Sequence, residues 1–368
     1  MLSPVIIGGG PAGAAAAALI AAAGRAVTLI ERTTAPTDKL CGDFLSGGAI
    51  AALRSLDLDP LTIGAIPLLT IRLVHRDTVA EAALPFPAVG LSRRVLDEAL
   101  LQLAVRHGAT VRRGESARTL EPAPAGFAVR TGTGNRLSTS TVFLATGKHD
   151  LRGQARPPRA DGLLGLKMYF DLASAQATAL SGCIELLLLN NGYAGLQLVA
   201  PSRAVFCVLL PAAHYRRVGR NWDSLLADLC SQASLLQRRL AGAAPCLPQP
   251  LAIAGTPYGH LHRTSRQAPP GLFRLGDQAC VVPSLAGDGI AIALHSAKAA
   301  ATAWLHGDNA RAYHAGFVHA AGTPLRFASL IHIACRMPAI QPLLASACRA
   351  WPATLRLAAA LSRVAPAR

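Results

Sequence analysis

Residues 4–13 read Pro-Val-Ile-Ile-Gly-Gly-Gly-Pro-Ala-Gly, and this stretch decides the fold. Its first four residues are apolar without alternation, which is typical of a parallel strand that is buried on both faces. Gly8, Gly10 and Gly13 satisfy the pattern Gly-x-Gly-x-x-Gly, which predicts a tight turn into a helix. The alanine-rich residues 14–23 predict that helix, and Gly24 is expected to end it.

The next segment completes a strand–helix–strand unit, because residues 26–30 predict a second buried strand that ends at Glu31. In such a unit Gly8 makes the turn, Gly10 lets a pyrophosphate approach the backbone, and Gly13 lets the helix pack on the strand. Free N–H groups at the helix start bind phosphate. Glu31 is placed to accept hydrogen bonds from an adenosine ribose. The unit predicts a dinucleotide site without separating NAD from FAD.

Three later segments favour FAD. Residues 141–147 predict a strand that ends in Ala-Thr-Gly, and residues 272–275 predict another that leads into Gly276-Asp277. Gly287-Asp288-Gly289 then opens a predicted helix over 290–304. An acid at a strand end can bind the ribityl hydroxyls of a flavin, and a Gly-x-Gly at a helix start can place N–H groups near its pyrophosphate or ring.

On these motifs the sequence resembles the FAD-dependent oxidoreductases of the para-hydroxybenzoate hydroxylase fold, and within them the geranylgeranyl reductase-like branch. Residues 39–46 (Lys-Leu-Cys-Gly-Asp-Phe-Leu-Ser) resemble the segment that runs along the flavin in that branch, and Arg93 matches the arginine that opens its third helix. The resemblance covers residues 1–150 and 270–305. With the motifs, it implies cofactor contacts at Gly8, Gly10, Pro11, Ala12, Gly13, Glu31, Arg32, Cys41, Gly42, Arg93, Thr146, Gly147, Gly276, Asp277, Gly287, Asp288, Gly289 and Ile290.

The predicted fold class is α/β: an FAD-binding Rossmann-like domain of the glutathione reductase type, an inserted antiparallel sheet for the substrate, and a helical C-terminal segment. The FAD domain is assigned to residues 1–75, 92–150 and 270–305. The substrate sheet is assigned to 76–91 and 151–269, and the helical region to 306–368. Hairpins are expected within 68–84 and 183–210, the second around Asn190-Asn191-Gly192.

Three side chains are candidates for catalysis: Lys167, Cys41 and Tyr193. Lys167 interrupts an apolar strand, so its ammonium is expected either to reach solvent or to point at the flavin. Cys41 either contacts substrate or fills space beside the cofactor. Tyr193 occupies the place of the reductases' Tyr-x-Trp-x-Phe-Pro motif, whose Trp and Phe-Pro are missing here. Pro283 stands one position earlier than the reductases' proline, and Ser284 takes its place.

Composition limits the partners. The chain has 368 residues and a formal net charge of +16, but its arginines are scattered and aromatic residues make up only 5%. This argues against nucleic-acid binding. The eight cysteines form no metal-ligand spacing, and His260 and His262 lack a third ligand, so no metal is expected.

We expect a cytoplasmic protein. Residues 306–368 predict either a packed helical lid or a face for peripheral membrane contact. The oligomeric state is not predicted.

The predicted activity is that of a flavin monooxygenase. FAD would be reduced by a transiently bound NAD(P)H and would hydroxylate a small apolar or aromatic substrate through a C4a-hydroperoxide. The absence of a second Gly-x-Gly-x-x-Gly after a strand argues against a separate nicotinamide domain.

Two alternatives stay open: reduction of carbon–carbon double bonds by FAD, and a flavin-binding accessory protein that acts on a partner. Trp222, Trp304 and Trp351 stand far apart, so the Trp-x-Trp-x-Ile-Pro signature of flavin halogenases is absent.

Overall fold

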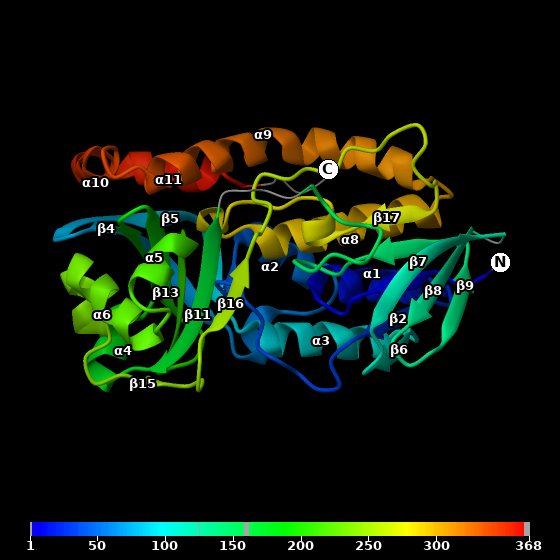
Figure 1. Ribbon diagram of the computed structural model, residues 1–368, viewed down its shortest axis with the longest axis horizontal. Coiled ribbons are helices and arrows are strands. Elements are labelled where there is room, and N and C mark those ends of the chain that lie inside the picture. Colours follow the sequence, from blue (N-terminus) through cyan, green and yellow to red (C-terminus); the bar gives the residue numbers. More distant parts are fainter. Residues whose placement is uncertain (1, 125, 158–161, 364–368) are drawn as a thin grey trace.

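A computed structural model describes residues 2–124, 126–157 and 162–363. Its first layer is a parallel sheet with the strand order β17-β10-β1-β2-β6 (Figure 1). The strands of this sheet span Val5–Ile7 (β1), Thr28–Glu31 (β2), Thr110–Arg113 (β6), Val142–Leu144 (β10) and Leu272–Arg274 (β17). Four of them were predicted from the sequence, and their alignment confirms that segments from the start, middle and end of the chain form one Rossmann-like sheet.

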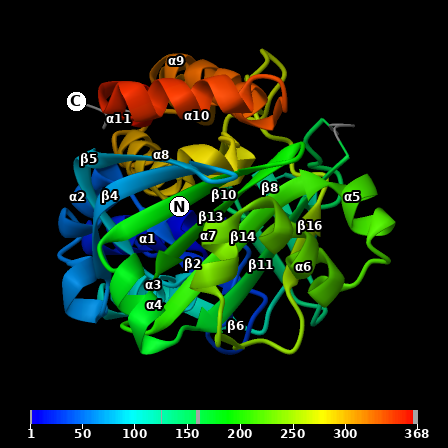
Figure 2. The same cartoon turned by 90° about the vertical axis from the view of Figure 1, so that its left-hand side faces the viewer.

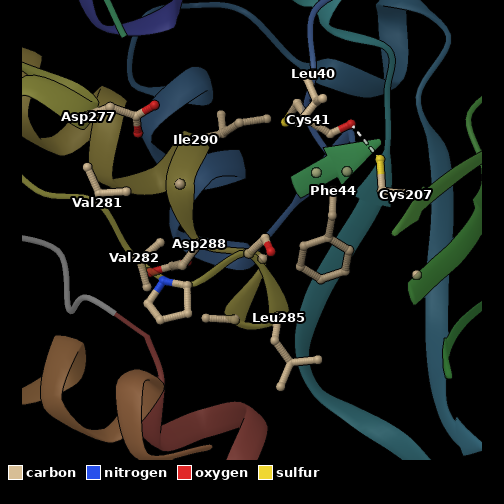
Figure 3. A pocket seen from close by; sticks show the side chains of 18 of the residues that line it. Leu40, Cys41, Phe44, Cys207, Asp277, Val281, Val282, Leu285, Asp288 and Ile290 are labelled. Atoms are coloured by element: carbon tan, nitrogen blue, oxygen red, sulfur yellow. Dashed lines mark hydrogen bonds between the residues drawn. The ribbon is translucent and has the colours of Figure 1, made fainter. Parts of the chain in front are cut away.

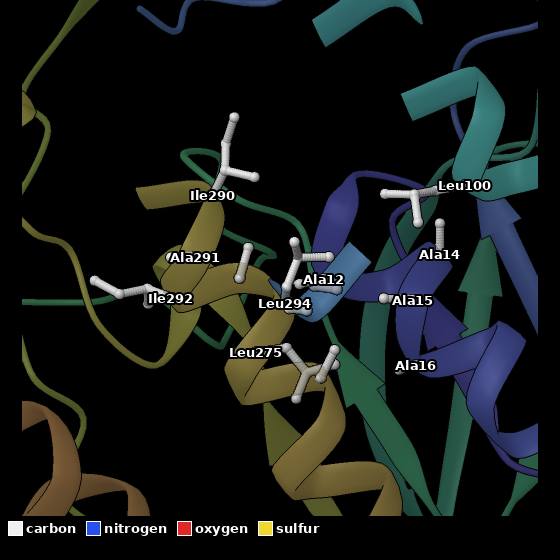
Figure 4. Packing of buried hydrophobic residues seen from close by; sticks show 14 of the residues in the cluster. Ala12, Ala14, Ala15, Ala16, Leu100, Leu275, Ile290, Ala291, Ile292 and Leu294 are labelled. Atoms are coloured by element: carbon white, nitrogen blue, oxygen red, sulfur yellow. The ribbon is translucent and has the colours of Figure 1, made fainter. Parts of the chain in front are cut away.

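Three helices pack beside this sheet: α1 (Pro11–Ala22), α3 (Arg93–Arg106) and α8 (Gly289–Leu305), and α1 packs against both of the others. Figure 4 shows these contacts: Ala12 of α1 lies beside Leu294 of α8, and Ala14 lies beside Leu100 of α3. Because alanine side chains are short, α1 can approach its neighbours closely while it still buries apolar surface. This packing fixes the positions of the first turns of α1 and α8.

The second layer is a larger mixed sheet with the order β15-β11-β14-β13-β12-β4-β5-β3, and β16 pairs with β11. Its strands are β3 (Phe44–Leu45), β4 (Ile66–His75), β5 (Thr78–Gly90), β11 (Leu163–Asp171), β12 (Cys183–Leu189), β13 (Gly192–Leu198), β14 (Arg203–Pro211), β15 (Ala244–Pro245) and β16 (Leu251–Ala254).

Both predicted hairpins are present, as β4–β5 and β12–β13. The sequence-based boundary at residue 75 left residues 66–75 in the FAD domain, but these residues form β4, which belongs to the mixed sheet. Residues 158–161 of the assigned insert lie outside the described residues.

The remaining elements are peripheral. A small antiparallel sheet, which the sequence did not reveal, contains β7 (Ala117–Ala123), β8 (Gly126–Thr131) and β9 (Arg136–Thr139). The short helices are α2 (Gly47–Arg54), η1 (Pro60–Ile63), α4 (Ser174–Leu180), α5 (Ala212–Arg217), α6 (Trp222–Gln232), α7 (Ser234–Arg239), η2 (Gly276–Gln278) and η3 (Ser284–Ala286). Of these, η2 and η3 carry the late glycine motifs to the site.

The C-terminal residues form a helical layer, as predicted for 306–368, although 364–368 lie outside the described residues. Its helices are α9 (Ala310–Arg336), α10 (Gln341–Ala350) and α11 (Pro352–Leu361). Figure 1 shows this layer along one side of the molecule, opposite α3. Among the described helices none is by itself long and apolar enough to cross a bilayer, although α9 and α10 meet those criteria together across a 111° bend.

The parallel pairing of β12 with β4 joins the two hairpins, and a buried ion cluster lies on it. Glu185 of β12 is fully buried and stands opposite Arg72 of β4 in the strand register. Its carboxylate accepts hydrogen bonds from Arg72 and from Arg239 of α7 at 3.2 and 2.9 Å. A buried carboxylate is tolerated only when it is paired in this way. The cluster therefore ties α7 and both hairpins together.

The variant Glu185→Gln is expected to lower the free energy of unfolding by about 3–5 kcal/mol, because it leaves two arginines facing a neutral group inside the protein. The matched control is Asp171→Asn, whose pair with Arg203 is about half exposed (48% and 45%) and should cost roughly 0–1 kcal/mol. Urea unfolding followed by circular dichroism measures both. Equal effects of the two changes would contradict the assigned role of burial.

Candidate functional site

A cavity lies where the carboxyl end of the parallel sheet meets the mixed sheet. Its floor is formed by Gly10, Pro11 and Ala12, by residues 40–42 with Phe44, and by residues 275–277 and 281–290. Its other wall is formed by strands β4, β12, β13 and β14. Figure 3 shows Leu40, Cys41 and Phe44 on one side and Asp277, Val281, Asp288 and Ile290 on the other. The fold therefore brings the early and late glycine motifs to one space.

The turn into α1 leaves no room for side chains. Gly8 has a φ of +105°, a conformation that glycine adopts readily. A Cβ on Gly13 would overlap the carbonyl oxygen of Gly8. This contact lets the helix start directly above the strand, so the first backbone N–H groups of α1 face the cavity that Pro11 and Ala12 line.

The residues at this turn fit a phosphate-containing cofactor. Among the described residues, no side chain caps the start of α1 or α8, and both starts line the same cavity. Uncapped N–H groups at a helix start carry a positive partial charge, which favours an anion. In the described part of the chain the buried Gln197 Oε1, on a residue that lines the cavity, also lacks a hydrogen-bond partner. A bound ligand with hydroxyl and phosphate oxygens would satisfy these groups.

Glu31 lies at the end of β2, beside the same turn. Its Oε2 accepts a hydrogen bond from the Gly9 N–H at 2.7 Å, and its Oε1 accepts two from Thr33. Burial acts to raise the pKa of Glu31, but the hydrogen bonds from Thr33 and Gly9 outweigh it and hold the pKa below its usual value. Glu31 is therefore an ionised acceptor. Beyond it, Arg32 contacts the His149 imidazole at 3.0 Å on the exposed side.

Arg93 joins the third helix to the glycine turn. Its guanidinium donates to both carboxylate oxygens of Asp97, at 2.6 and 2.8 Å, and lines the cavity. A Cβ at Gly10 would lie 3.3 Å from its Nη2. A bidentate pair holds the guanidinium in one plane. Arg93 is thus fixed where a phosphate or ring oxygen would approach Gly10.

The segment 39–43 is pinned to the mixed sheet by a buried polar cluster. Asp43 is fully buried and has a φ of +54°. Its Oδ2 accepts hydrogen bonds from Lys167 Nζ at 2.7 Å and from the Tyr169 hydroxyl at 2.5 Å. Burial raises the pKa of the Asp43 carboxyl, and the donors Lys167 and Tyr169 act against that rise. The Lys167 ammonium also donates to the carbonyl of Lys39.

This geometry corrects the expectation for Lys167. Its side chain neither reaches solvent nor lines the cavity, because it is fully buried in the ion pair with Asp43. The contact that sequence reasoning missed is the one with Asp43, which lies 124 residues away in the chain. Lys167 therefore positions the segment that carries Cys41 and Gly42, and the structure offers no direct contact for it with a ligand in the cavity.

Cys41 and its neighbours face the cavity. The Cys207 thiol donates to the Cys41 carbonyl at 3.2 Å (Figure 3), and Gln197 Nε2 donates to the carbonyls of Gly42 and Asp43. Burial raises the pKa of Cys207 to about 12, so its thiol is neutral. These contacts hold the backbone of the segment and leave the Cys41 Sγ to accept a hydrogen bond from the Asp43 N–H.

Tyr193 lies on the opposite wall, within a polar cluster that the sequence did not predict. Its hydroxyl is 2.9 Å from Ser284 Oγ and 3.1 Å from His332 Nδ1 of α9, and it accepts a hydrogen bond from the Leu285 N–H. Tyr193, Tyr258 and Ser284 line the cavity. Burial raises the pKa of Tyr193, so the hydroxyl stays protonated. No local sequence signal links His332 to this site, because the contact depends on how α9 packs.

The structure thus brings most of the predicted site residues to one cavity. The predicted residues that line it are Gly10, Pro11, Ala12, Cys41, Gly42, Arg93, Gly147, Tyr193, Gly276, Asp277, Gly287, Asp288, Gly289 and Ile290. Gly8, Gly13, Glu31, Arg32, Thr146 and Lys167 lie outside its lining. The Asp288 carboxylate accepts hydrogen bonds from Ser46 and Arg363. Lys148, which sequence reasoning missed, lines the cavity and donates to the Leu40 carbonyl.

Comparison with known proteins agrees with this geometry. A family model described as an FAD binding domain matches residues 2–133, which include the glycine turn, Glu31 and Arg93. The chain carries an FAD-binding domain. A search of the curated proteins finds no match.

Solved structures extend the likeness over the whole chain. The flavin-dependent brominase Bmp2 superposes with a TM-score of 0.78 at 17% identity, over 98% of this chain and 93% of that one. The myxobacterial chondrochloren halogenase CndH gives a TM-score of 0.77 at 17% identity, over 98% and 90%. The structure of pqsL, a probable FAD-dependent monooxygenase from Pseudomonas aeruginosa, gives 0.73 at 17%, over 91% and 95%.

The family match confirms the predicted FAD cofactor, and the solved structures confirm the predicted fold. At such low identity the structures show only a shared fold. What each neighbour acts on is a property of that neighbour and is not assigned to this chain. None of the comparisons tests the geranylgeranyl reductase-like branch, which stays a prediction.

The variant Gly13→Ala is expected to abolish copurified flavin, because the added Cβ must displace the Gly8 carbonyl and with it the phosphate-binding turn. The matched control is Gly316→Ala on the exposed side of α9, outside the cavity lining, where a Cβ would meet nothing within 4 Å. Visible absorbance per protein and thermal melting measure both variants. A Gly13→Ala protein with wild-type flavin content and melting temperature would contradict the steric argument.

A double-mutant cycle tests the interaction between Asp43 and Lys167. Each of Asp43→Asn and Lys167→Met should lower the free energy of unfolding by about 3–5 kcal/mol, because each leaves one buried partner unpaired. The double variant should cost less than the sum of the two. Chemical unfolding of apoprotein and holoprotein gives these values. Strict additivity would mean that the two groups do not interact.

Proposed function

We propose that the chain is an FAD-dependent monooxygenase that hydroxylates a small apolar or aromatic substrate and takes its reducing equivalents from NAD(P)H. The observation that carries this proposal is a largely apolar cavity that continues directly from the cofactor-binding segments. Its sheet wall is lined by Ile71, Leu84, Ile184, Leu186, Val208 and Leu209. When bound, FAD supplies two-electron chemistry with molecular oxygen.

The apolar wall has a clear role in such a reaction. Ile184 and Leu186 of β12 and Val208 of β14 leave few groups that could hold water. Excluding water protects a reactive oxidant from side reactions and strengthens the remaining polar contacts. Leu285 and Val282 extend this surface from the loop next to the flavin-binding motif (Figure 3). The chain therefore provides a shielded space beside the predicted isoalloxazine contacts Gly287 and Gly289.

The cluster of Tyr193, Ser284 and Tyr258 provides the polar end of that space. Because the Tyr193 hydroxyl stays protonated, it can donate to a hydroxyl or carbonyl of the substrate, or accept from a substrate hydroxyl. Its contacts with the Leu285 N–H and His332 fix its direction. A few fixed polar groups in an apolar pocket orient a ligand and select it. An aromatic substrate with one polar substituent matches this arrangement.

Reduction of a carbon–carbon double bond is the second candidate. Such a reaction needs a proton as well as a hydride, and Tyr193 places a hydroxyl on the cavity wall. Burial raises the pKa of that hydroxyl and makes it a weak acid, which is why this reaction ranks second. Halogenation is not favoured, although halogenases share the fold, because the Trp-x-Trp-x-Ile-Pro signature is absent from the sequence. An accessory role for a flavin-binding protein without turnover is the third possibility.

Anaerobic reduction of the purified protein, followed by rapid mixing with oxygenated buffer, distinguishes these functions. For a monooxygenase we expect a transient absorbance that differs from both the reduced and the oxidised spectra, and consumption of oxygen that depends on NAD(P)H. Direct return to the oxidised spectrum would contradict monooxygenase chemistry and favour the reductase. A flavin that no reductant reduces would favour the accessory role.

The variant Tyr193→Phe provides the matched test of the cavity in this experiment. Removing the hydroxyl frees the loop at Ser284 and Leu285, so the transient should decay at least several-fold faster as water enters. The control is Tyr215→Phe on α5, outside the cavity lining. Equal decay in both variants would mean that Tyr193 does not shield the reaction.

A further inference from the structure

The outer face of the C-terminal layer is unusually apolar. Large side chains on α9–α11 that are exposed include Leu330 at 63%, Leu343 at 70% and Trp351 at 68%. The full set, called here the outer helical face, is Phe327, Leu330, Ile333, Met337, Leu343, Trp351, Leu357 and Leu361. Large apolar side chains that are exposed together on one helical layer are typical of an interaction site in a folded protein.

Helical spacing shows that these side chains point away from the molecule. On α9 the buried residues Leu325, Ala328, His332 and Cys335 form one stripe, and Leu330 lies on the opposite side of the helix. Leu343 of α10 and Leu357 of α11 lie opposite the buried residues of their helices in the same way. Figures 1 and 2 both show α10 and α11 in one outer layer. The exposed side chains therefore share an outward direction.

The charge on this layer has a single sign. No Asp or Glu follows Asp308 in the sequence, whereas arginines occur at 311, 326, 336, 349, 356, 363 and 368. Arg326, Arg349 and Arg356 are exposed and lie among the apolar side chains of the outer helical face. Arginine next to tryptophan and leucine is the pattern of a helix at a membrane–water interface, where the stem lies along apolar surface and the guanidinium meets phosphate.

We propose that the outer helical face docks the protein on an anionic lipid bilayer. The apolar side chains of α9–α11 enter the boundary between headgroups and acyl chains, and the arginines pair with lipid phosphates. The docking is peripheral, in the plane of the membrane. It does not depend on the reaction proposed above, because it rests only on the exposed residues of this layer.

A second copy of the chain is a poorer occupant of this face. A symmetric dimer would bring Arg326, Arg349 and Arg356 of both copies together, and this layer contains no carboxylate to pair with them. Like charges in a desolvated interface cost several kcal/mol. An anionic bilayer supplies the missing counter-charge in excess. Charge complementarity therefore selects lipid.

The layer also borders the cavity. Arg363, just after α11, lines the cavity and lies over the Phe86 ring, 4.4 Å from its centre. His332 of α9 contacts Tyr193 on the cavity wall. Docking would therefore bring the apolar cavity close to a store of lipid-dissolved molecules. This placement suits a substrate that is poorly soluble in water.

Vesicle flotation of the full chain with bound flavin tests the proposal. The probes are vesicles of phosphatidylcholine alone and vesicles with roughly one third phosphatidylglycerol. Wild-type protein should float with the anionic vesicles and much less with the neutral ones, and added salt should reduce the binding. Failure to float with either vesicle at any lipid concentration would overturn the proposal.

Paired variants separate docking from misfolding. The double variant Leu343→Gln/Leu357→Gln should lose binding at least tenfold, and Arg349→Gln/Arg356→Gln should lose it on anionic vesicles by about tenfold or more. The control Leu61→Gln changes an exposed leucine (46%) that lies in η1, which packs against α2 and α3, and should bind as wild type. Thermal melting and flavin content verify folding.

Two outcomes would contradict the assigned face. The first is equal loss of binding in Leu61→Gln and in the paired variants, since the loss would then have no specific location. The second is a dimer, detected by light scattering without lipid, that Leu343→Gln/Leu357→Gln dissociates while the wild-type protein fails to float. That result would assign the face to a second copy of the chain.

Discussion

The close approach of α1 to the carboxyl end of β1 is the constraint on which the rest of the structure depends. Gly13 touches the backbone of Gly8, and any side chain there would push the helix away. With the helix in place, its first N–H groups open onto the cavity, and α8 packs along its alanines from the other side. Two helix starts can converge on one ligand only because α1 is this close to the strand.

A second constraint sets the distance between the two sheets. The segment 39–46 crosses from one to the other, and it is held by buried polar contacts with Lys167, Tyr169 and Gln197 of the mixed sheet. A buried charge pair contributes little net stability compared with apolar packing, but it tolerates only one geometry. The pair of Asp43 and Lys167 therefore fixes the position of segment 39–46 over the cavity. Apolar contacts alone would allow the segment to shift along the sheet.

The sequence predicted those parts of the site that depend on local order. The glycine turn, Glu31, the late Gly-Asp motifs and the hairpin at Asn190-Asn191 follow from spacing along the chain, and the structure contains each of them. Contacts between distant segments could not be predicted. Lys167 illustrates this limit, because its partner Asp43 has an uncommon positive φ and lies in a loop. The position of β4 in the mixed sheet was not predicted for the same reason, because its parallel partner β12 follows more than a hundred residues later in the chain.

The C-terminal layer connects the molecular surface to the chemistry inside. α9 reaches Tyr193 through His332, and the end of α11 reaches Asp288 at the start of α8 through Arg363. Tyr193 in turn holds the N–H of Leu285, which lies in the loop between the two late glycine motifs. A rigid-body shift of α9–α11 would therefore move both the polar end of the cavity and the α8 start. The same helix α9 is also tied to β17 of the Rossmann-like sheet, because the Tyr313 hydroxyl donates to the Arg274 carbonyl at 2.9 Å. One long helix therefore contacts both the sheet that carries the glycine turn and the wall that carries Tyr193.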